Sequence, residues 1–353
     1  MKTTIPLFTC LLALFILSSC SKGGGSATPT PPPPTPTNNE LLVTFSKNEI
    51  AADGFDEAII KVKDLNNADV TGSTTIYVND VQVSSPVFYT NQAGSYSIKA
   101  ISGSKQSTIA TIKAVVPPAS PFTQKVLAEA FSGTWCGICP GTIIPLENYT
   151  NTNPNVISVG VHGPNGSSDP FQYVFDSQLR STYSVSGVPT VLLNRDIKWN
   201  NTNSQLIQLA QQKAPLGLAF ETSVNGSTII VKTKVKFDVS TSIPLKLIVM
   251  LVEDGILYNQ ANYGHFGLPN PIPNFRHKNI LRVAATDIFG DAIPVSAQVK
   301  GTTWEKSVSL NAGAYNIANS FIVATVIYGT NSQNRKGTLN TQIVAAGQNK
   351  DFD

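Results

Sequence analysis

The strongest constraint on the fold is a pair of cysteines, Cys136 and Cys139, separated by two residues. The chain has four cysteines, and the other two, Cys10 and Cys20, lie within or directly after an apolar N-terminal run. If that run is an export signal, Cys136 and Cys139 are the thiols that remain in the mature protein. They can then form a disulfide only with each other.

The N-terminus has the features of a bacterial export signal over residues 1–19. Lys2 precedes an apolar run over residues 5–17, which is too short to span a bilayer because a membrane helix needs about 20 apolar residues. The run leads into Leu17-Ser18-Ser19-Cys20, which resembles the lipobox of bacterial lipoproteins. The resemblance implies acylation of Cys20, which would anchor the chain to a membrane. The alternative is a plain signal peptide in which Cys20 is incidental.

The charge pattern gives no reason to expect a nucleic-acid partner. Charged residues make up 13% of the chain, the formal net charge is +3, and the basic residues are not clustered. Few charges together with many turn-forming residues are typical of exported, strand-rich proteins.

We predict a multidomain chain with a tether and three folded units. Residues 20–39 are rich in Gly and Pro and should form an extended tether. Residues 40–117 alternate short apolar runs with polar turns and resemble bacterial immunoglobulin-like β-sandwich domains. Residues 121–215 follow the order β-α-β-α-β-β-α, which predicts a central α/β unit. Residues 216–349 return to strands and predict a C-terminal β-sandwich, interrupted by a long loop over 258–279.

The two cysteines lie where a buried strand over 125–131 changes to a helix over 139–149. The sequence Trp135-Cys136-Gly137-Ile138-Cys139-Pro140, followed about 50 residues later by Gly187-Val188-Pro189-Thr190, resembles thioredoxin. The resemblance implies a thioredoxin-like fold with a cis Pro189. It also implies that Trp135, Val188 and Pro189 contact the substrate.

A helix start favours the reactive form of a thiol, because its unpaired N–H groups stabilise a thiolate. We therefore expect Cys136 to be the exposed nucleophile and Cys139, one turn further on, to be the resolving thiol. Thioredoxins bury a carboxylate six residues before the first cysteine, and that position is Ala130 here. The neighbouring Glu129 should point to the other face of its strand.

The cysteine pair has two other interpretations, a structural disulfide and a zinc site. A structural disulfide that never turns over remains an alternative. A zinc site would need four ligands, and only His162, His265 and His277 are available to supplement the pair. We expect neither a metal nor a cofactor. We expect His277 to anchor a loop and Arg195 to be a solvated or paired charge at a hairpin tip.

The lipobox, the cysteine motif, the Gly-Val-Pro-Thr segment with Asn194-Arg195, and the stretch from His277 to Arg282 together resemble the family named after outer-membrane protein 28. The resemblance covers residues 121 to about 348. It implies a lipoprotein with a thioredoxin-like domain and a C-terminal β-domain. Ser21 and Lys22 follow Cys20 where an aspartate would favour inner-membrane retention, so we expect the outer membrane.

The leading hypothesis is therefore a lipid-anchored thiol–disulfide oxidoreductase, with protein thiols or disulfides of the cell envelope as clients. The alternative hypothesis is a binding or adhesion lipoprotein without catalysis, in which the Cys136–Cys139 disulfide is structural.

Overall fold

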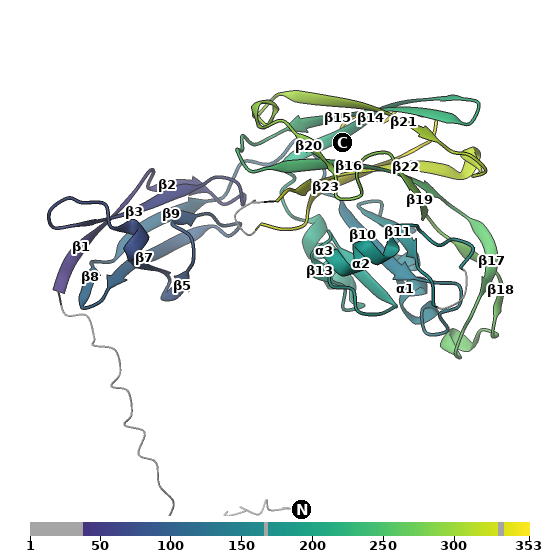
Figure 1. The fold of residues 1–353 in the computed structure, drawn as a ribbon, viewed down its shortest axis with the longest axis horizontal. Helices are drawn as coiled ribbons and strands as arrows, with labels where there is room; N and C mark the ends of the chain where they lie inside the picture. The colour runs from purple at the N-terminus through teal and green to yellow at the C-terminus, as the bar shows by residue number, and fades with distance from the viewer. Residues whose placement is uncertain (1–37, 166–168, 331–334) are drawn as a thin grey trace, which may run out of the picture.

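The computed structural model describes residues 38–165, 169–330 and 335–353 (Figure 1). The predicted signal peptide, Cys20 and the predicted tether up to residue 37 lie outside the described residues. Residues 38 and 39, which the sequence assigned to the tether, already belong to the first strand. Among the helices that are described, none is long and apolar enough to cross a membrane.

Residues 38–115 form a β-rich unit at the N-terminal end of the described chain (Figure 1). Its strands pair in the order β2-β9-β7-β8-β1-β3-β6, and β4 pairs with β5 and β7. Alternate residues of β3 are buried, including Ala58, Ile60 and Val62, and they contribute to an apolar core. The elements are β1 (Asn38–Phe45), β2 (Glu49–Ala51), β3 (Ala58–Asp64), η1 (Thr71–Ser73), β4 (Thr75–Val78), β5 (Val81–Val83), β6 (Val87–Phe88), β7 (Gly94–Ser102), β8 (Lys105–Ser107) and β9 (Ala110–Val115).

The next region has the element order β-α-β-α-β-β-α that the sequence predicted. The elements are β10 (Val126–Ser132), α1 (Pro140–Thr150), β11 (Val156–His162), α2 (Asp176–Thr182), β12 (Thr190–Leu193), β13 (Ile197–Lys198) and α3 (Asn203–Ala210). Strand β10 is parallel to β11 and antiparallel to β12, which is antiparallel to β13. Every residue of β10 is buried, because apolar side chains of α1 and α3 pack on one face and those of α2 on the other.

The sheet does not end at the predicted boundary between residues 215 and 216. Strand β11 pairs with β19, and the order continues through β16 and β22 to β23, with β20 on β16. The strands predicted as a separate C-terminal sandwich therefore share a sheet with the α/β region. Strand β16 is apolar on both faces, so it needs cover on both sides. The added strands are β16 (Leu245–Glu253), β19 (Ile280–Ala284), β20 (Asp291–Ile293), β22 (Ser320–Tyr328) and β23 (Thr338–Ala345).

A smaller sheet supplies that cover on one face. It consists of β14 (Leu216–Asn225), β15 (Thr228–Phe237) and β21 (Thr303–Asn311), in the order β14-β15-β21. Its apolar residues form one core with those of β16, β22 and β23. On the opposite face of the large sheet, Ile248 and Met250 join the core that contains Leu179 of α2. Short 3-10 turns lie at η3 (Val295–Ala297) and η4 (Ile317–Asn319).

The loop predicted over 258–279 is largely a two-stranded arm, so that prediction was wrong. The arm, residues 256–277, consists of β17 (Ile256–Gln260), the 3-10 turn η2 (His265–Gly267) and β18 (Ile272–His277). It leaves the large sheet after β16, runs beside the α/β region and returns to β19 (Figure 1). His277 therefore ends a strand, whereas the sequence placed it in a loop.

A buried ion pair lies within the α/β region, and its arginine also bonds to the segment between β19 and β20. Arg195, 4% exposed, donates to both carboxylate oxygens of Glu129 at 2.6 to 3.1 Å. It also donates to the hydroxyl of Tyr183 and to the carbonyl of Ile288. Glu129 does face away from Ala130, as the strand pattern predicted, but Arg195 is buried and paired rather than solvated.

Replacing Arg195 should be costly, because it would leave Glu129 buried without its partner. We predict that Arg195→Leu lowers the free energy of unfolding by about 3 to 5 kcal/mol, and that Glu129→Leu in the same chain restores most of it. Guanidinium unfolding measures both. Arg276→Leu is the control, because Arg276 pairs with Asp254 at the surface and should contribute about 1 kcal/mol or less. Equal losses in the single and the double variant would contradict the assignment.

Candidate functional site

Cys136 and Cys139 form a disulfide in the turn between β10 and α1, with a Cα–Cα distance of 5.3 Å. The helix begins at Pro140 and Cys139 is its N-cap, so Cys136 lies three residues before the cap. Both cysteines are buried, with exposed fractions of 4% and 1%. The prediction of an exposed Cys136 at the helix start was therefore wrong.

The arm binds the cysteine turn through main-chain hydrogen bonds. The N–H of Ala261 donates to the carbonyl of Thr134 at 2.8 Å, and the N–H of Tyr263 donates to the carbonyl of Gly137 at 2.7 Å. The buried side-chain amide of Gln260 donates to the carbonyls of Gly133 and Cys136 at 3.2 and 3.0 Å. The arm thus donates to four carbonyls of the turn.

Two glycines let the arm approach this closely. A Cβ atom on Gly137 would lie 2.4 Å from the ring of Tyr263, and one on Gly141 would lie 2.7 Å from the ring of His265. A side chain at either position would therefore displace one of these rings. Gly137, inside the cysteine motif, therefore leaves room for the ring of Tyr263 to pack directly against the main chain.

The predicted substrate-contacting residues lie at the same edge of the sheet as the cysteines. Thr190, the first residue of β12, pairs with Phe131 near the end of β10, so the segment before it borders the cysteine turn. Val188 and Pro189 in that segment are half-buried, and the peptide bond between them is cis, as predicted. Trp135 is also half-buried, and its indole N–H donates to the carbonyl of Gly163 at 2.9 Å.

Asp169, a buried aspartate that the sequence analysis did not single out, connects the cysteine turn to the segment before α2. Asp169 accepts hydrogen bonds from the N–H of Thr134 at 2.6 Å and from the N–H of Phe171 at 2.8 Å. It also lies 3.2 Å from Nδ1 of His162. Burial alone would raise the pKa of Asp169, but these partners outweigh burial and hold it below its ordinary value.

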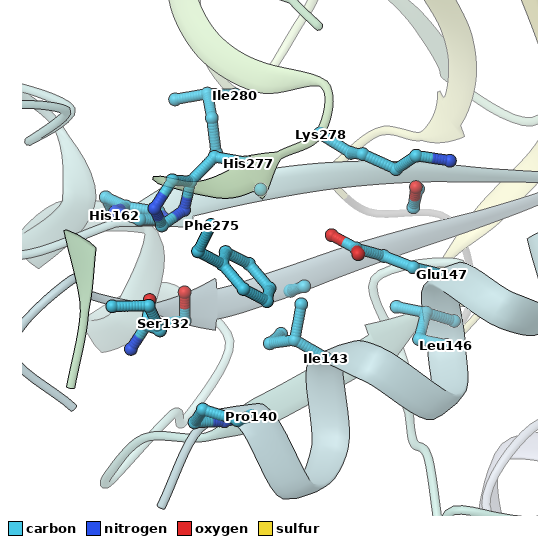
Figure 2. Close-up of a pocket in the computed structure, with 14 residues that line it drawn as sticks. Ser132, Pro140, Ile143, Leu146, Glu147, His162, Phe275, His277, Lys278 and Ile280 are labelled. Atoms are coloured by element: carbon cyan, nitrogen blue, oxygen red, sulfur yellow. The ribbon is translucent and has the colours of Figure 1, made fainter. Parts of the chain in front are cut away.

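His162 and His277 belong to an aromatic cluster between β11 and the arm (Figure 2). Their rings meet edge to face at a centroid distance of 5.4 Å, and Phe171 and Phe275 pack against His277. Burial, together with repulsion from His162, lowers the pKa of His277 to about 3, so it is neutral at physiological pH. Its Nε2 is buried and hydrogen-bonds to no described residue. No three His, Cys, Asp or Glu side chains converge as metal ligands within residues 38–165, 169–330 and 335–353.

A small cavity of about 30 Å³ lies between α1, strands β10 and β11, and the base of the arm, with room for one or two water molecules. Ala130, where the resemblance to thioredoxin would place a carboxylate, lines it together with Pro140, His277 and Glu147 (Figure 2). Burial raises the pKa of Glu147 on α1 to about 7, although the charge of Lys278 opposes the shift. A carboxyl group with a raised pKa therefore borders this cavity, on an element that the sequence did not single out.

Residues 176–350 match the family model described as Outer membrane protein Omp28. Over these residues the chain belongs to the Omp28 family. The match begins at α2, so the cysteine turn lies before the matched segment while the Omp28 segment includes Val188, Pro189 and the whole arm. No curated protein matches the chain.

One solved structure shares the fold over much of the chain. HBP35 of Porphyromonas gingivalis aligns with 65% of this chain and 76% of its own length, with a TM-score of 0.53 and 18% identity. A β-glucosidase from Kluyveromyces marxianus aligns with 84% of this chain and 45% of its own length, and MtrC from Shewanella baltica with 88% and 71%. Both are 10% identical, and their TM-scores are 0.19 and 0.20. Only the first likeness bears on the fold.

The raised pKa of Glu147 makes the stability of this Omp28-family chain depend on pH. The unfolded chain loses the Glu147 proton near pH 4.5, while the folded chain keeps it until about pH 7. The contribution of Glu147 to stability should therefore fall as the pH rises from about 4.5 to 7, and stay low above that.

We predict that Glu147→Gln, measured against the native chain by denaturant unfolding, gains on the order of 1 kcal/mol between pH 5 and pH 8. The gain follows because the amide keeps the shape of the protonated carboxyl group and never acquires its buried charge. Glu305→Gln is the control, because Glu305 lies exposed on β21 and its replacement should show no comparable gain. A stability difference between Glu147→Gln and the native chain that does not change with pH would contradict the assignment.

Proposed function

We propose that this chain is a lipid-anchored outer-membrane protein whose residues 121–215 form a thioredoxin-like unit that exchanges disulfides with envelope polypeptides. The observation that carries the proposal is the Cys136–Cys139 disulfide between β10 and α1, at the same edge of the sheet as the cis Val188–Pro189 bond. The order and directions of β10 to β13 also support a thioredoxin-like unit.

The exchange reaction balances within the two partners. In the reduced form, the Cys136 thiolate attacks a client disulfide, and the mixed disulfide forms as one client sulfur leaves as a thiolate. Cys139, after losing its proton, attacks Sγ of Cys136 and releases the second client thiolate. The client gains two electrons, and the pair returns to the disulfide present in this structure. The reverse sequence oxidises a client dithiol.

The attachment to the membrane is argued from the N-terminus and from the family. The lipobox-like Leu17-Ser18-Ser19-Cys20 supports acylation of Cys20, and the description of the family model supports the outer membrane. Residues 40–117, which carry no cluster of catalytic side chains, would serve as an immunoglobulin-like spacer above the tether.

A second candidate function is favoured by the burial of both cysteines. A disulfide with so little exposed surface is the expected state of a structural bond, which would make the chain a non-catalytic binding or adhesion protein. The two candidates differ in whether Cys136 ever reacts with another protein.

We predict that Cys139→Ser traps client proteins in mixed disulfides through Cys136. The substitution leaves the attacking thiol intact but removes the thiol that completes exchange, so a short-lived intermediate should accumulate. Non-reducing gels of the native envelope, followed by mass spectrometry of the bands, measure the trapping.

The matched control is Cys136→Ser with Cys139 intact, because the deeper Cys139 should trap far less. If neither variant yields a reducible adduct, while a known envelope oxidoreductase trap succeeds in the same cells, the second candidate function is the correct one.

A further inference from the structure

The segment Gln260–Tyr263 binds the cysteine turn in the way a foreign polypeptide would. Two of its main-chain N–H groups, on Ala261 and Tyr263, donate to carbonyls of the turn. Donors two residues apart on one side of a chain are the pattern that the edge of a β-strand presents to a partner. Main-chain acceptors do not select a particular sequence, so they can accept another polypeptide equally well.

We propose that this arm segment is an internal mimic of the client polypeptide, which must displace it to reach Cys136. The inference rests on the proposed function, because it assigns a client to the same site. It also reconciles an exchange-competent cysteine pair with the 4% exposure of Cys136.

The contacts of the arm describe the client that would replace it. The client offers two N–H groups two residues apart, and a large flat side chain in the place of the Tyr263 ring on Gly137. Ile138, between the two cysteines, is 50% exposed and adds apolar surface next to Gly137. The partner is therefore an extended polypeptide segment that carries a cysteine and, close to it, an aromatic residue.

The arm can leave the turn without unfolding the sheet. Strands β17 and β18 pair with each other and with no strand of the large sheet among the described residues. Tyr263 is 70% exposed, so lifting it uncovers little additional apolar surface. Asn262 is buried and bonds to the backbone of His265 and Leu268, which keeps the tip in one shape when it moves.

The first experiment measures how fast excess dithiothreitol reduces the Cys136–Cys139 disulfide in the intact protein, with alkylation and mass spectrometry as the readout. Gln260→Ala/Tyr263→Ala removes the amide and the ring that hold the turn and should speed reduction roughly tenfold or more. Gly137→Ala should act in the same direction from the other side of the contact, since its Cβ displaces the Tyr263 ring. Leu257→Ala, on an exposed part of the same arm, is the control and should leave the rate unchanged. Unchanged rates in both arm-opening variants, with folding verified by circular dichroism, would overturn the proposal.

The second experiment uses a labelled synthetic peptide of residues 258–268, which contains no cysteine. Fluorescence anisotropy should show roughly tenfold or tighter binding to Gln260→Ala/Tyr263→Ala than to the native protein, whose own arm competes. Equal binding to both proteins, or no binding to the opened variant, would overturn the mimicry. Neither experiment requires exchange with a natural client, so failure of the Cys139→Ser trap would count against the proposed function and leave these results standing.

Discussion

The pairing of β11 with β19 places the arm beside the cysteine turn. Gly160 of β11 pairs with Ile280, its N–H donates to the carbonyl of Asn279 at 2.9 Å, and a Cβ at this glycine would collide with the Ile280 side chain. This contact joins the α/β region to the C-terminal strands in one sheet. Because the arm lies between β16 and β19, the same contact places the base of the arm next to the end of β11, beside the cysteine turn.

The chemistry of the cysteine pair follows from that placement. A thiol at a helix start is activated by the unpaired N–H groups, and here the arm also donates hydrogen bonds to carbonyls of the same turn. In the account proposed above, a client polypeptide would displace the arm to reach Cys136. A small cavity between α1, strands β10 and β11, and the arm is lined by Ala130 and by Glu147, whose pKa burial raises to about 7.

The sequence predicted those features that depend on local signals. The order of elements from β10 to α3 could be predicted because apolar runs, turn residues and helix-forming segments alternate clearly there, and the cis Pro189 followed from a motif. The shared sheet could not be predicted, because an apolar strand such as β16 has the same pattern whether its neighbour is in the same unit or in another. The arm was missed because its exposed strands lack the alternation that marks a half-buried strand. Arg195 looked like a charge at a hairpin tip, and only the fold brings Glu129 beneath it.

The central claim is that Cys136 and Cys139 form an exchange-active pair under a displaceable cover, and the reduction potential of that pair tests it most directly. The purified protein would be equilibrated in glutathione buffers of graded composition until each sample reaches equilibrium, and the reduced fraction would be counted by alkylation and mass spectrometry. We predict a potential between about −120 and −270 mV, the range of thiol–disulfide exchange proteins. A potential below about −300 mV would mark the bond as structural and contradict the account.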